Sequence, residues 1–241
     1  MATEAESKVA AVIGVGPGLG AALARRFAAG GYSVAMVARD AAKLDRLAAE
    51  IKATGGRALP VAANVAQAEE IERAFSAIRR GFGNPEILIY NAAMRPFGRL
   101  METRPSTFEN TWRVNAFGAF LCAQHVVPAM LAAGRGAILF TGATAGERPY
   151  PTSAAFGPAK FAMRGLAQVM ARDLGPQGVH VVYVNIDGAI DMPFIHERFP
   201  DLKEEDMLRP AAIADAYWYL AHQDRSCWTH VLDVRPFKEK F

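Results

Sequence analysis

Short apolar runs alternate along the chain with longer stretches in which apolar residues recur every three or four positions. The short runs are typical of buried strands and the longer stretches of amphipathic helices, so the alternation predicts a parallel sheet joined by crossover helices. The expected strands begin at Val9 and then cover residues 33–38, 58–63, 86–90, 137–140, 179–186 and 231–234. The first expected helix ends at Ala29, and the others cover residues 41–53, 68–80, 106–131, 158–174 and 211–222.

The first apolar run breaks into a turn that contains four glycines between residues 14 and 20. Glycine lets the backbone approach a pyrophosphate, and the amides at the following helix N-terminus attract its negative charge. Two registers fit a dinucleotide-binding fingerprint, Gly16-x-Gly18-x-x-Ala21 and the wider Gly14-x-x-x-Gly18-x-Gly20. Both predict a nucleotide site in the first strand–turn–helix unit, and a tight turn without a ligand is the alternative.

Composition and charge restrict the class of protein. The chain has 241 residues, of which 51% are apolar, and this suits one α/β domain with a large core. Its net charge of +3 comes from scattered basic residues, so we expect neither a nucleic-acid nor a membrane partner. The acidic residues within positions 1–8 do not fit a signal peptide, and no apolar run is long enough to span a bilayer. Cys122 and Cys227 fit reduced, buried thiols, and the histidine spacing indicates no metal site, so we expect a cytoplasmic protein.

Residues 191–209 form the one irregular stretch, with two prolines and mixed acidic and apolar residues. The stretch follows the penultimate expected strand, so it lies near the carboxyl ends of the strands, where ligands bind in open parallel sheets. We expect a substrate lid at this position, with an ordinary surface connection as the alternative. Its apolar residues favour an apolar or aromatic substrate, or they pack the lid onto the body.

An ordered set of motifs resembles the short-chain dehydrogenase/reductase family over essentially the whole chain. The set consists of Gly14, Gly18 and Gly20, then Asn91-Ala92-Ala93, then Asn115 and Lys160. The resemblance implies a single Rossmann-like, doubly wound α/β domain with a mostly parallel seven-stranded sheet and helices on both faces. It also implies a nicotinamide-dependent oxidoreductase that forms a homodimer or homotetramer through its fourth and fifth long helices.

The resemblance implies contacts to a cofactor at several positions. The pyrophosphate would lie at Gly14, Gly18, Leu19 and Gly20, the adenosine at Asn64, Val65 and Asn91, the nicotinamide ribose at Lys160, and the carboxamide at the backbone of Ile190. The second strand ends at Ala38-Arg39, and an arginine suits a 2′-phosphate by charge and fork geometry. We therefore expect NADP(H) rather than NAD(H). Asp40 is the rival acid for an NAD ribose, but it is also placed to cap the next helix.

The chain departs from the family at the positions that handle the proton. The family uses a Ser, a Tyr and a Lys with an Asn that anchors a water relay. Lys160 and Asn115 match, but Phe156 stands at the Tyr position and Ala143 at the Ser position. Phe has no proton to donate, and general acid–base assistance is worth roughly two to four orders of magnitude in rate.

Three groups are candidates to replace the missing hydroxyls. Thr144 lies beside the Ser position and could polarise a carbonyl, or it could satisfy loop backbone instead. Asp187 follows the sixth strand, where the family has Pro, and a buried carboxyl with a raised pKa can act as an acid. Tyr150 lies between two prolines, which is also typical of a surface corner. Met192 replaces a Thr of the family in the same region.

Two functions fit these residues. The first is an NADP(H)-dependent oxidoreductase that acts on a small carbonyl or alcohol substrate with altered proton transfer. The second is an NADP(H)-binding scaffold or sensor without catalysis, which the pair Phe156 and Ala143 favours.

Overall fold

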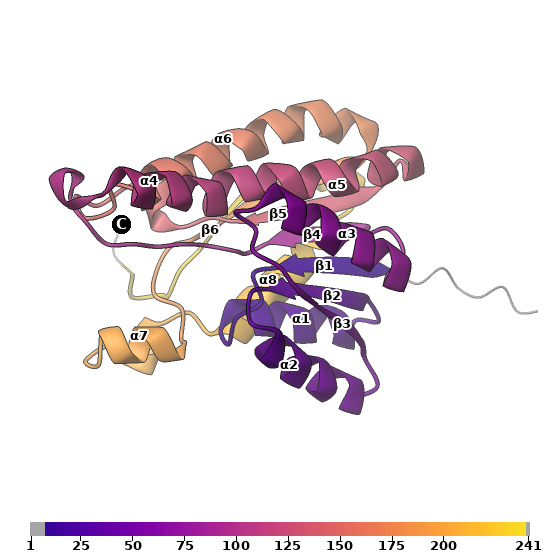
Figure 1. The fold of residues 1–241 in the computed structure, drawn as a ribbon, viewed down its shortest axis with the longest axis horizontal. Helices are drawn as coiled ribbons and strands as arrows, with labels where there is room; N and C mark the ends of the chain where they lie inside the picture. Colours follow the sequence, from indigo (N-terminus) through magenta and orange to yellow (C-terminus); the bar gives the residue numbers. More distant parts are fainter. Residues whose placement is uncertain (1–7, 240–241) are drawn as a thin grey trace, which may run out of the picture.

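The structure, a computed structural model, describes residues 8–239, in which seven strands form one sheet between two layers of helices (Figure 1). All neighbouring strands are parallel, in the order β3-β2-β1-β4-β5-β6-β7. The strands are β1 (Val9–Ile13), β2 (Ser33–Ala38), β3 (Arg57–Ala62), β4 (Ile87–Tyr90), β5 (Gly136–Thr141), β6 (Val179–Ile186) and β7 (Val231–Val234). The strand order reverses between β1 and β4, which is where open α/β sheets bind ligands.

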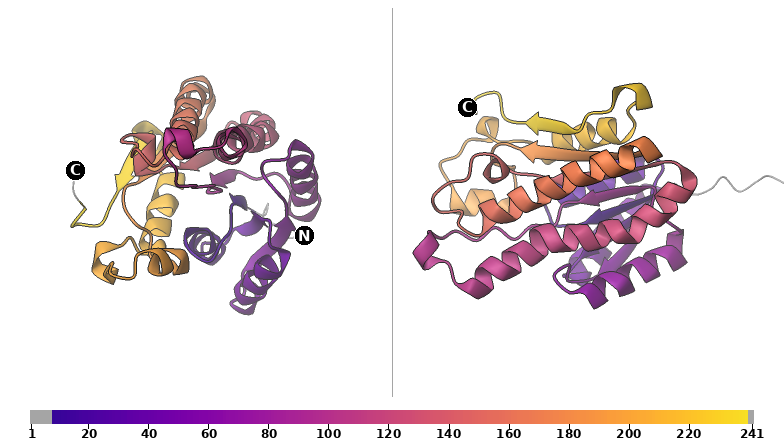
Figure 2. Two further views of the ribbon diagram at one scale, coloured as in Figure 1. Left: turned by 60° about the vertical axis from the view of Figure 1, so that its left-hand side comes forward. Right: turned by 90° about the horizontal axis from the view of Figure 1, so that it is seen from above.

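Helices cover both faces of the sheet, so the central strands are mostly apolar rather than alternating. In β1, Ala10 and Val12 face one layer, whereas Ala11 and Ile13 face the other. The first layer holds α1 (Leu19–Ala29), α2 (Ala41–Ala53) and α8 (Pro210–Ala221). The second layer holds α3 (Ala68–Phe82), α4 (Pro105–Trp112), α5 (Gly118–Ala133) and α6 (Phe156–Leu174). Figure 2 shows α5 and α6 side by side over the sheet.

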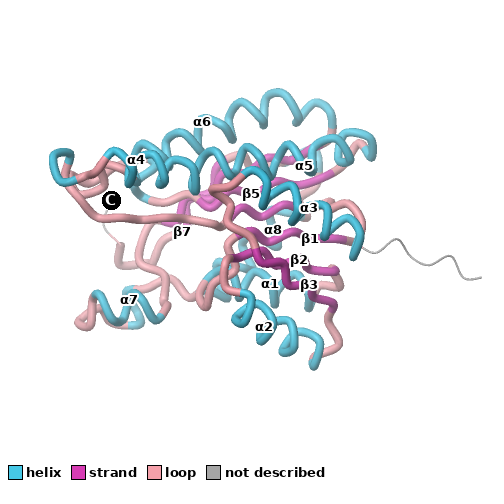
Figure 3. Tube along the Cα trace, viewed as in Figure 1, coloured by secondary structure: helices cyan, strands magenta, loops and turns pink. Residues whose placement is uncertain are grey.

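Loops that follow the strands gather at one end of the sheet, together with α7 (Pro193–Arg198) (Figure 3). Parallel strands bring their carboxyl ends to a common edge, so the segments after β1, β4, β5 and β6 meet there. Short 3₁₀ turns occur at η1 (Leu100–Glu102), η3 (Thr144–Gly146), η4 (Gly175–Gln177), η5 (Glu204–Asp206) and η6 (Arg225–Cys227). A hollow of about 660 Å³ lies at the opposite edge, near Lys8, Glu86 and Trp228.

The helix expected at residues 106–131 consists of α4, a π-helical turn at η2 (Arg113–Phe117) and α5. The whole stretch, Pro105–Ala133, is long and apolar enough by length and composition to cross a membrane, which the sequence analysis did not anticipate. Its inner face, including Cys122 and Val126, packs in the core against the sheet. Core helices of soluble proteins have the same length and composition, so this stretch does not by itself indicate a membrane protein.

The sequence-based strands at residues 33–38, 179–186 and 231–234 are confirmed to the residue. The stretch at 191–209 is more ordered than expected, because it contains α7 and η5. Cys122 is buried, but Cys227 is exposed, so the prediction of two buried thiols was wrong for Cys227. The inference that the N-terminal segment is not a signal peptide concerns residues 1–7, which lie outside the described residues.

Candidate functional site

At two positions of the glycine turn after β1, neighbouring backbone atoms leave no space for a side chain. A Cβ at Gly14, whose φ is +93°, would lie 2.3 Å from the backbone nitrogen of Ala92. A Cβ at Gly20 would lie 2.4 Å from the carbonyl oxygen of Gly14. At Gly16 a Cβ would meet nothing within 4 Å. Packing therefore favours the wider register through Gly14, Gly18 and Gly20 over the register that uses Gly16.

Asn91 connects the glycine turn to the end of β4. Its Nδ2 donates a hydrogen bond of 2.8 Å to the carbonyl oxygen of Gly14, and its backbone amide donates 2.8 Å to Ile13. Helix α1 begins at Leu19, directly after Gly18, so its first amides lack partners within the helix. The turn thus presents backbone donors and a helix N-terminus at the carboxyl edge of the sheet, as a pyrophosphate requires.

The end of β2 carries an exposed arginine. Arg39 forms no hydrogen bond or ion pair with another residue in the part of the chain that the structure describes. Asp40 is engaged elsewhere, because its carboxylate caps α2 by accepting from the backbone amide of Lys43 at 3.1 Å. Its Oδ2 also lies 3.0 Å from the Lys43 ammonium. The helix-capping interpretation of Asp40 is confirmed, and Arg39 is the charged group available at this strand end.

Asn64 and Val65 follow β3 at the same edge. The side-chain oxygen of Asn64 accepts a 3.1 Å hydrogen bond from the backbone amide of Ala66. The backbone amide of Asn64 donates a 2.7 Å hydrogen bond to the Glu70 carboxylate. A carbonyl oxygen has two lone pairs, so this turn leaves Asn64 one acceptor position. Val65 is buried in the core beneath α5.

Asn115 lies in the middle of the π-helical turn and is fully buried. Its Nδ2 donates hydrogen bonds of 2.9 Å to the carbonyl oxygens of Met94 and Thr111. A π turn shifts the helical hydrogen bonds by one residue, and the Asn115 amide satisfies the carbonyl of Thr111 there. Its Oδ1 has no hydrogen-bond partner within residues 8–239. A buried oxygen without a partner is costly and is a position for a water or ligand donor.

Lys160 and Phe156 lie one turn apart at the start of α6. Phe156 is 5% exposed, and the Nζ of Lys160 lies 5.5 Å from the centre of its ring. The Nζ donates a hydrogen bond of 2.7 Å to the carbonyl oxygen of Thr141, at the end of β5. Burial without a carboxylate partner lowers the pKa of Lys160 to about 7. The lysine has further donors beyond the one that Thr141 receives.

Asp187, which the sequence suggested as a proton donor, is ion-paired in the structure. Its side chain is 2% exposed, and its Oδ2 accepts a 2.7 Å hydrogen bond from Arg148 and lies 3.3 Å from the Arg235 guanidinium. Asp187 instead holds together the segments that follow β5, β6 and β7.

Thr144 and Tyr150, the two hydroxyl candidates from the sequence, lie in the segment between β5 and α6. Thr144 begins the η3 turn and is partly buried, and within the described residues no hydrogen bond engages its hydroxyl. Its carbonyl oxygen accepts from the amides of Glu147 and Arg148, so the backbone at this position is satisfied. Tyr150 is 53% exposed, in agreement with a surface corner.

The first residues of the 191–209 segment contact the glycine turn after β1. A Cβ at Gly18 would lie 3.1 Å from the Cβ of Met192, so Met192 covers the turn. The two ends of the segment are joined, because Leu208 donates 2.8 Å to Ala189 and Asp191 donates 2.9 Å to Leu208. Neither bond uses the backbone of Ile190, which leaves its amide available for a ligand.

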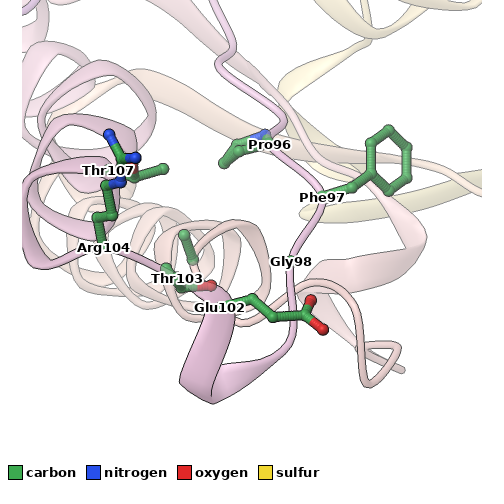
Figure 4. A pocket seen from close by; sticks show the side chains of 8 residues that line it. Pro96, Phe97, Gly98, Glu102, Thr103, Arg104 and Thr107 are labelled. Carbon is green, nitrogen blue, oxygen red and sulfur yellow. The ribbon is translucent and has the colours of Figure 1, made fainter.

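The sequence analysis missed Arg95, in the segment after β4. Its guanidinium lies 5.9 Å from the ring centre of Phe156 and 5.2 Å from that of Phe97. The residues that follow Arg95, Pro96 to Gly98, line one side of a cavity of about 200 Å³, together with Glu102, Arg104 and Ala155 (Figure 4). The signal in the sequence was a basic residue four positions after Asn91, too small a pattern to single out.

Comparisons with known proteins agree with this arrangement. A family model described as short chain dehydrogenase matches residues 8–202. A short-chain dehydrogenase/reductase of Armillaria gallica is 32% identical over 179 residues, which are 73% of this chain and 69% of that protein. The 3-oxoacyl-(acyl-carrier-protein) reductase of Staphylococcus epidermidis is 30% identical over 200 residues, which are 83% of this chain and 82% of that protein.

Solved structures extend the similarity to the complete fold. A short-chain dehydrogenase from Rhodopseudomonas palustris is 35% identical with a TM-score of 0.83, covering 97% of this chain and 100% of that chain. A metagenomic short-chain oxidoreductase in complex with NADP is 30% identical with a TM-score of 0.84, covering 96% of this chain and 98% of that chain. This chain therefore belongs to the short-chain dehydrogenase/reductase family.

Proposed function

We propose that this chain is an NADP(H)-dependent oxidoreductase that acts on a carbonyl or alcohol substrate, with a proton transfer that differs from the family's. Support comes from the family, whose solved members include an NADP complex 30% identical to this chain. The observation that carries the proposal is the fully buried Lys160. A lysine of this kind is expensive to bury, and its remaining donors suit the hydroxyls of a ribose.

The residues at the carboxyl edge of the sheet fit the cofactor. Protein backbone closes on Gly14 and Gly20, so the turn keeps its tight shape only without a Cβ there, and the amides from Gly18 onward would receive the pyrophosphate. Arg39 pairs with a 2′-phosphate, Asn64 and Val65 line the adenine, and the amide of Ile190 meets the carboxamide. When bound, the nicotinamide supplies or accepts the hydride at the carbonyl carbon.

Proton transfer is the step in which this chain differs from its family. Phe156 occupies the position of the family's Tyr, and the Asp187 carboxylate contacts the guanidinium groups of two arginines. The hydroxyl of Thr144 remains to polarise a carbonyl oxygen, and the buried Oδ1 of Asn115 remains to anchor a water. In carbonyl reduction, hydride transfer then forms an alkoxide that takes its proton from water or from Lys160, whose pKa is about 7.

An NADPH titration tests the cofactor site independently of turnover. The fluorescence of NADPH is followed during titration of the protein, for the natural chain, for Arg39→Ala and for the control Arg80→Ala on α3. We expect Arg39→Ala to weaken NADPH binding by at least tenfold and to leave NADH binding unchanged, because it removes a charge-assisted contact to the 2′-phosphate. Failure of the natural chain to bind either dinucleotide would refute the proposal.

A non-catalytic NADP(H)-binding scaffold or sensor is the second candidate function. The pair Phe156 and Ala143 favours it, because neither side chain can donate a proton. A screen of ketones and alcohols with saturating cofactor separates the two functions. Cofactor binding without turnover of any compound supports the scaffold.

We also propose that the chain self-associates through α5 and α6. Phe120 on α5 and Phe161 on α6 are 40% and 45% exposed and suit a homodimer or homotetramer interface. Val126 on α5 and Met163 on α6 are completely buried in the core, so they do not contribute to such an interface. Light scattering of the natural chain and of Phe161→Glu tests this interface. We also propose a cytoplasmic location, for which a fluorescent fusion is the test.

A further inference from the structure

Arg95 places a guanidinium beside the ring of Phe156, the residue at the position of the family's Tyr. The guanidinium carbon of Arg95 lies 5.9 Å from the centre of the Phe156 ring. It also lies 5.2 Å from the ring centre of Phe97, two residues along the chain. Within residues 8–239 no carboxylate or carbonyl oxygen pairs with this guanidinium. Its N–H groups are therefore available to a ligand.

The backbone on both sides of Arg95 is fixed to other parts of the site. The carbonyl oxygen of Met94, the preceding residue, accepts a 2.9 Å hydrogen bond from the buried Asn115. The amide of Gly98 donates a 2.8 Å hydrogen bond to the carbonyl oxygen of Thr152, in the segment that leads into α6. Arg95 thus lies between two anchors, one on the π-helical turn and one next to the start of α6. A donor on fixed backbone can be preorganised for a reacting atom.

The electrostatics of Arg95 suit an oxyanion. Partial burial of the guanidinium lowers the pKa of Arg95, although the residue as a whole is exposed, and the Tyr150 phenol acts in the opposite direction. Contact with an aromatic ring stabilises an exposed cation only weakly and satisfies none of its N–H donors. A guanidinium stays charged at any pH at which proteins are folded, so it donates hydrogen bonds but no proton. It is therefore suited to stabilise a negative oxygen and not to act as an acid.

The chain lacks the hydroxyls that serve the substrate oxygen in its family. Phe156 and Ala143 stand at the positions of the Tyr and the Ser, and neither side chain has a hydrogen-bond donor. Thr144 offers one neutral hydroxyl next to Ala143. A guanidinium beside the Phe156 ring adds a charged donor, and charge-assisted hydrogen bonds are about twice as strong as neutral ones.

We propose that Arg95 is a catalytic residue, whose guanidinium donates hydrogen bonds to the carbonyl oxygen of a substrate held beside Phe156. The inference rests on the proposed oxidoreductase function and deepens its proton step. In reduction the carbonyl carbon gains a hydride from NADPH, which is oxidised to NADP⁺, and the electron pair of the C=O bond moves onto the oxygen that Arg95 holds. The alkoxide then takes a proton from water, which leaves hydroxide, so Arg95 remains charged throughout.

A phenol introduced at position 156 tests whether Arg95 lies beside that oxygen. Phe156→Tyr is titrated at alkaline pH by its tyrosinate absorbance, with and without Arg95→Gln and in the absence of cofactor. Each protein is compared with its own Phe156 parent, so the difference removes the native tyrosines, including Tyr150. We expect Arg95→Gln to raise the pKa of the introduced phenol by about one pH unit or more, because a neighbouring guanidinium favours the phenolate. The control is Arg99→Gln, at an exposed position of the same segment, and no rise in Arg95→Gln or an equal rise in the control would overturn the inference.

Turnover tests the role of the same guanidinium. Reduction of acetophenone, cyclohexanone and diacetyl by NADPH is measured for the natural chain, Arg95→Gln, Arg95→Lys and Arg99→Gln, together with NADPH binding by fluorescence. We expect Arg95→Gln to lower kcat by about 100-fold or more, the usual loss for one oxyanion donor, and to leave NADPH affinity unchanged. Arg95→Lys should retain part of kcat because it keeps the charge, and Arg99→Gln should retain all of it.

Three outcomes of these measurements overturn the inference. The first is a kcat that Arg95→Gln leaves unchanged, whatever the titration gives. The second is a loss of NADPH binding in Arg95→Gln, which would assign Arg95 to the cofactor. The third is NADPH binding by the natural chain without reduction of any of the three ketones, which supports the scaffold. Failure of the natural chain to bind NADPH refutes the proposed function itself, and the inference with it.

Discussion

The buried ammonium of Lys160 predicts a pH dependence of folding stability that can be worked out from the structure. Its pKa falls from 10.5 to about 7 on folding because burial penalises the charged form. Below pH 7 the lysine is protonated in both states and the penalty is complete, at about 5 kcal/mol. Between pH 7 and 10.5 the unfolded chain binds one more proton than the folded chain, so this penalty decreases as pH rises.

Replacement of Lys160 by Met removes this titration and keeps a side chain of similar length. Urea unfolding at pH 7, 8 and 9 gives the unfolding free energy of both proteins at one protein concentration. We expect the value for the natural chain to rise relative to Lys160→Met by about 2 kcal/mol between pH 7 and 9. Lys160→Met also loses the hydrogen bond to Thr141. This shifts the difference in unfolding free energy by a constant of about 1 kcal/mol and leaves its dependence on pH unchanged.

The control for this experiment is Lys52→Met, which removes an exposed lysine of α2. Its difference from the natural chain should stay flat over the same pH range. Groups other than Lys160 are common to both proteins and cancel in the comparison. A flat difference for Lys160→Met as well would refute the reasoning, because it would mean that Lys160 remains protonated in the folded chain.

Three further predictions concern other residues. Phe156→Tyr should raise NADPH-dependent ketone reduction by about 100-fold or more, since it restores a phenol near the lysine, and an unchanged rate would show that the proton comes from elsewhere. Gly165→Ala, in an open position of α6, should stabilise by about 1 kcal/mol in thermal unfolding, whereas Gly118→Ala should destabilise because its Cβ would lie 2.5 Å from a tyrosine hydroxyl. Asp187→Asn should lower the unfolding free energy by about 2 kcal/mol, which corresponds to roughly 4–8 °C in Tm, and no change would indicate that the pair with Arg235 contributes nothing.

The fold was predictable because local pattern and tertiary environment agree. A strand such as β6 is buried on both faces, so its mostly apolar sequence, with only His180 and Asn185 polar, marks the strand. The π turn at Asn115 was not predictable, since one inserted residue leaves the apolar periodicity of a long helix almost unchanged. The short helix α7 has too few residues to produce a periodic pattern.

For the site residues too, local patterns were predictable and contacts between distant segments were not. The spacing of Gly14 and Gly20 is a local property, and the structure confirms that backbone closes on both positions. The role of Asp187 depends on two arginines distant in the sequence, one before α6 and one after β7, which no local pattern connects. Arg95 meets Phe156 only through the fold, so its place beside that ring required the structure.

The joined ends of the 191–209 segment make it an exchangeable module. The bonds from Leu208 to Ala189 and from Asp191 to Leu208 close the excursion at its base, beside the end of β6. The entropy of closing a loop grows only slowly with its length, so inserted or deleted residues between these anchors cost little while the anchors persist. This one excursion can therefore change in length and sequence while the sheet and its glycine turn stay constant, and insertions into the chain are best tolerated between its two anchors.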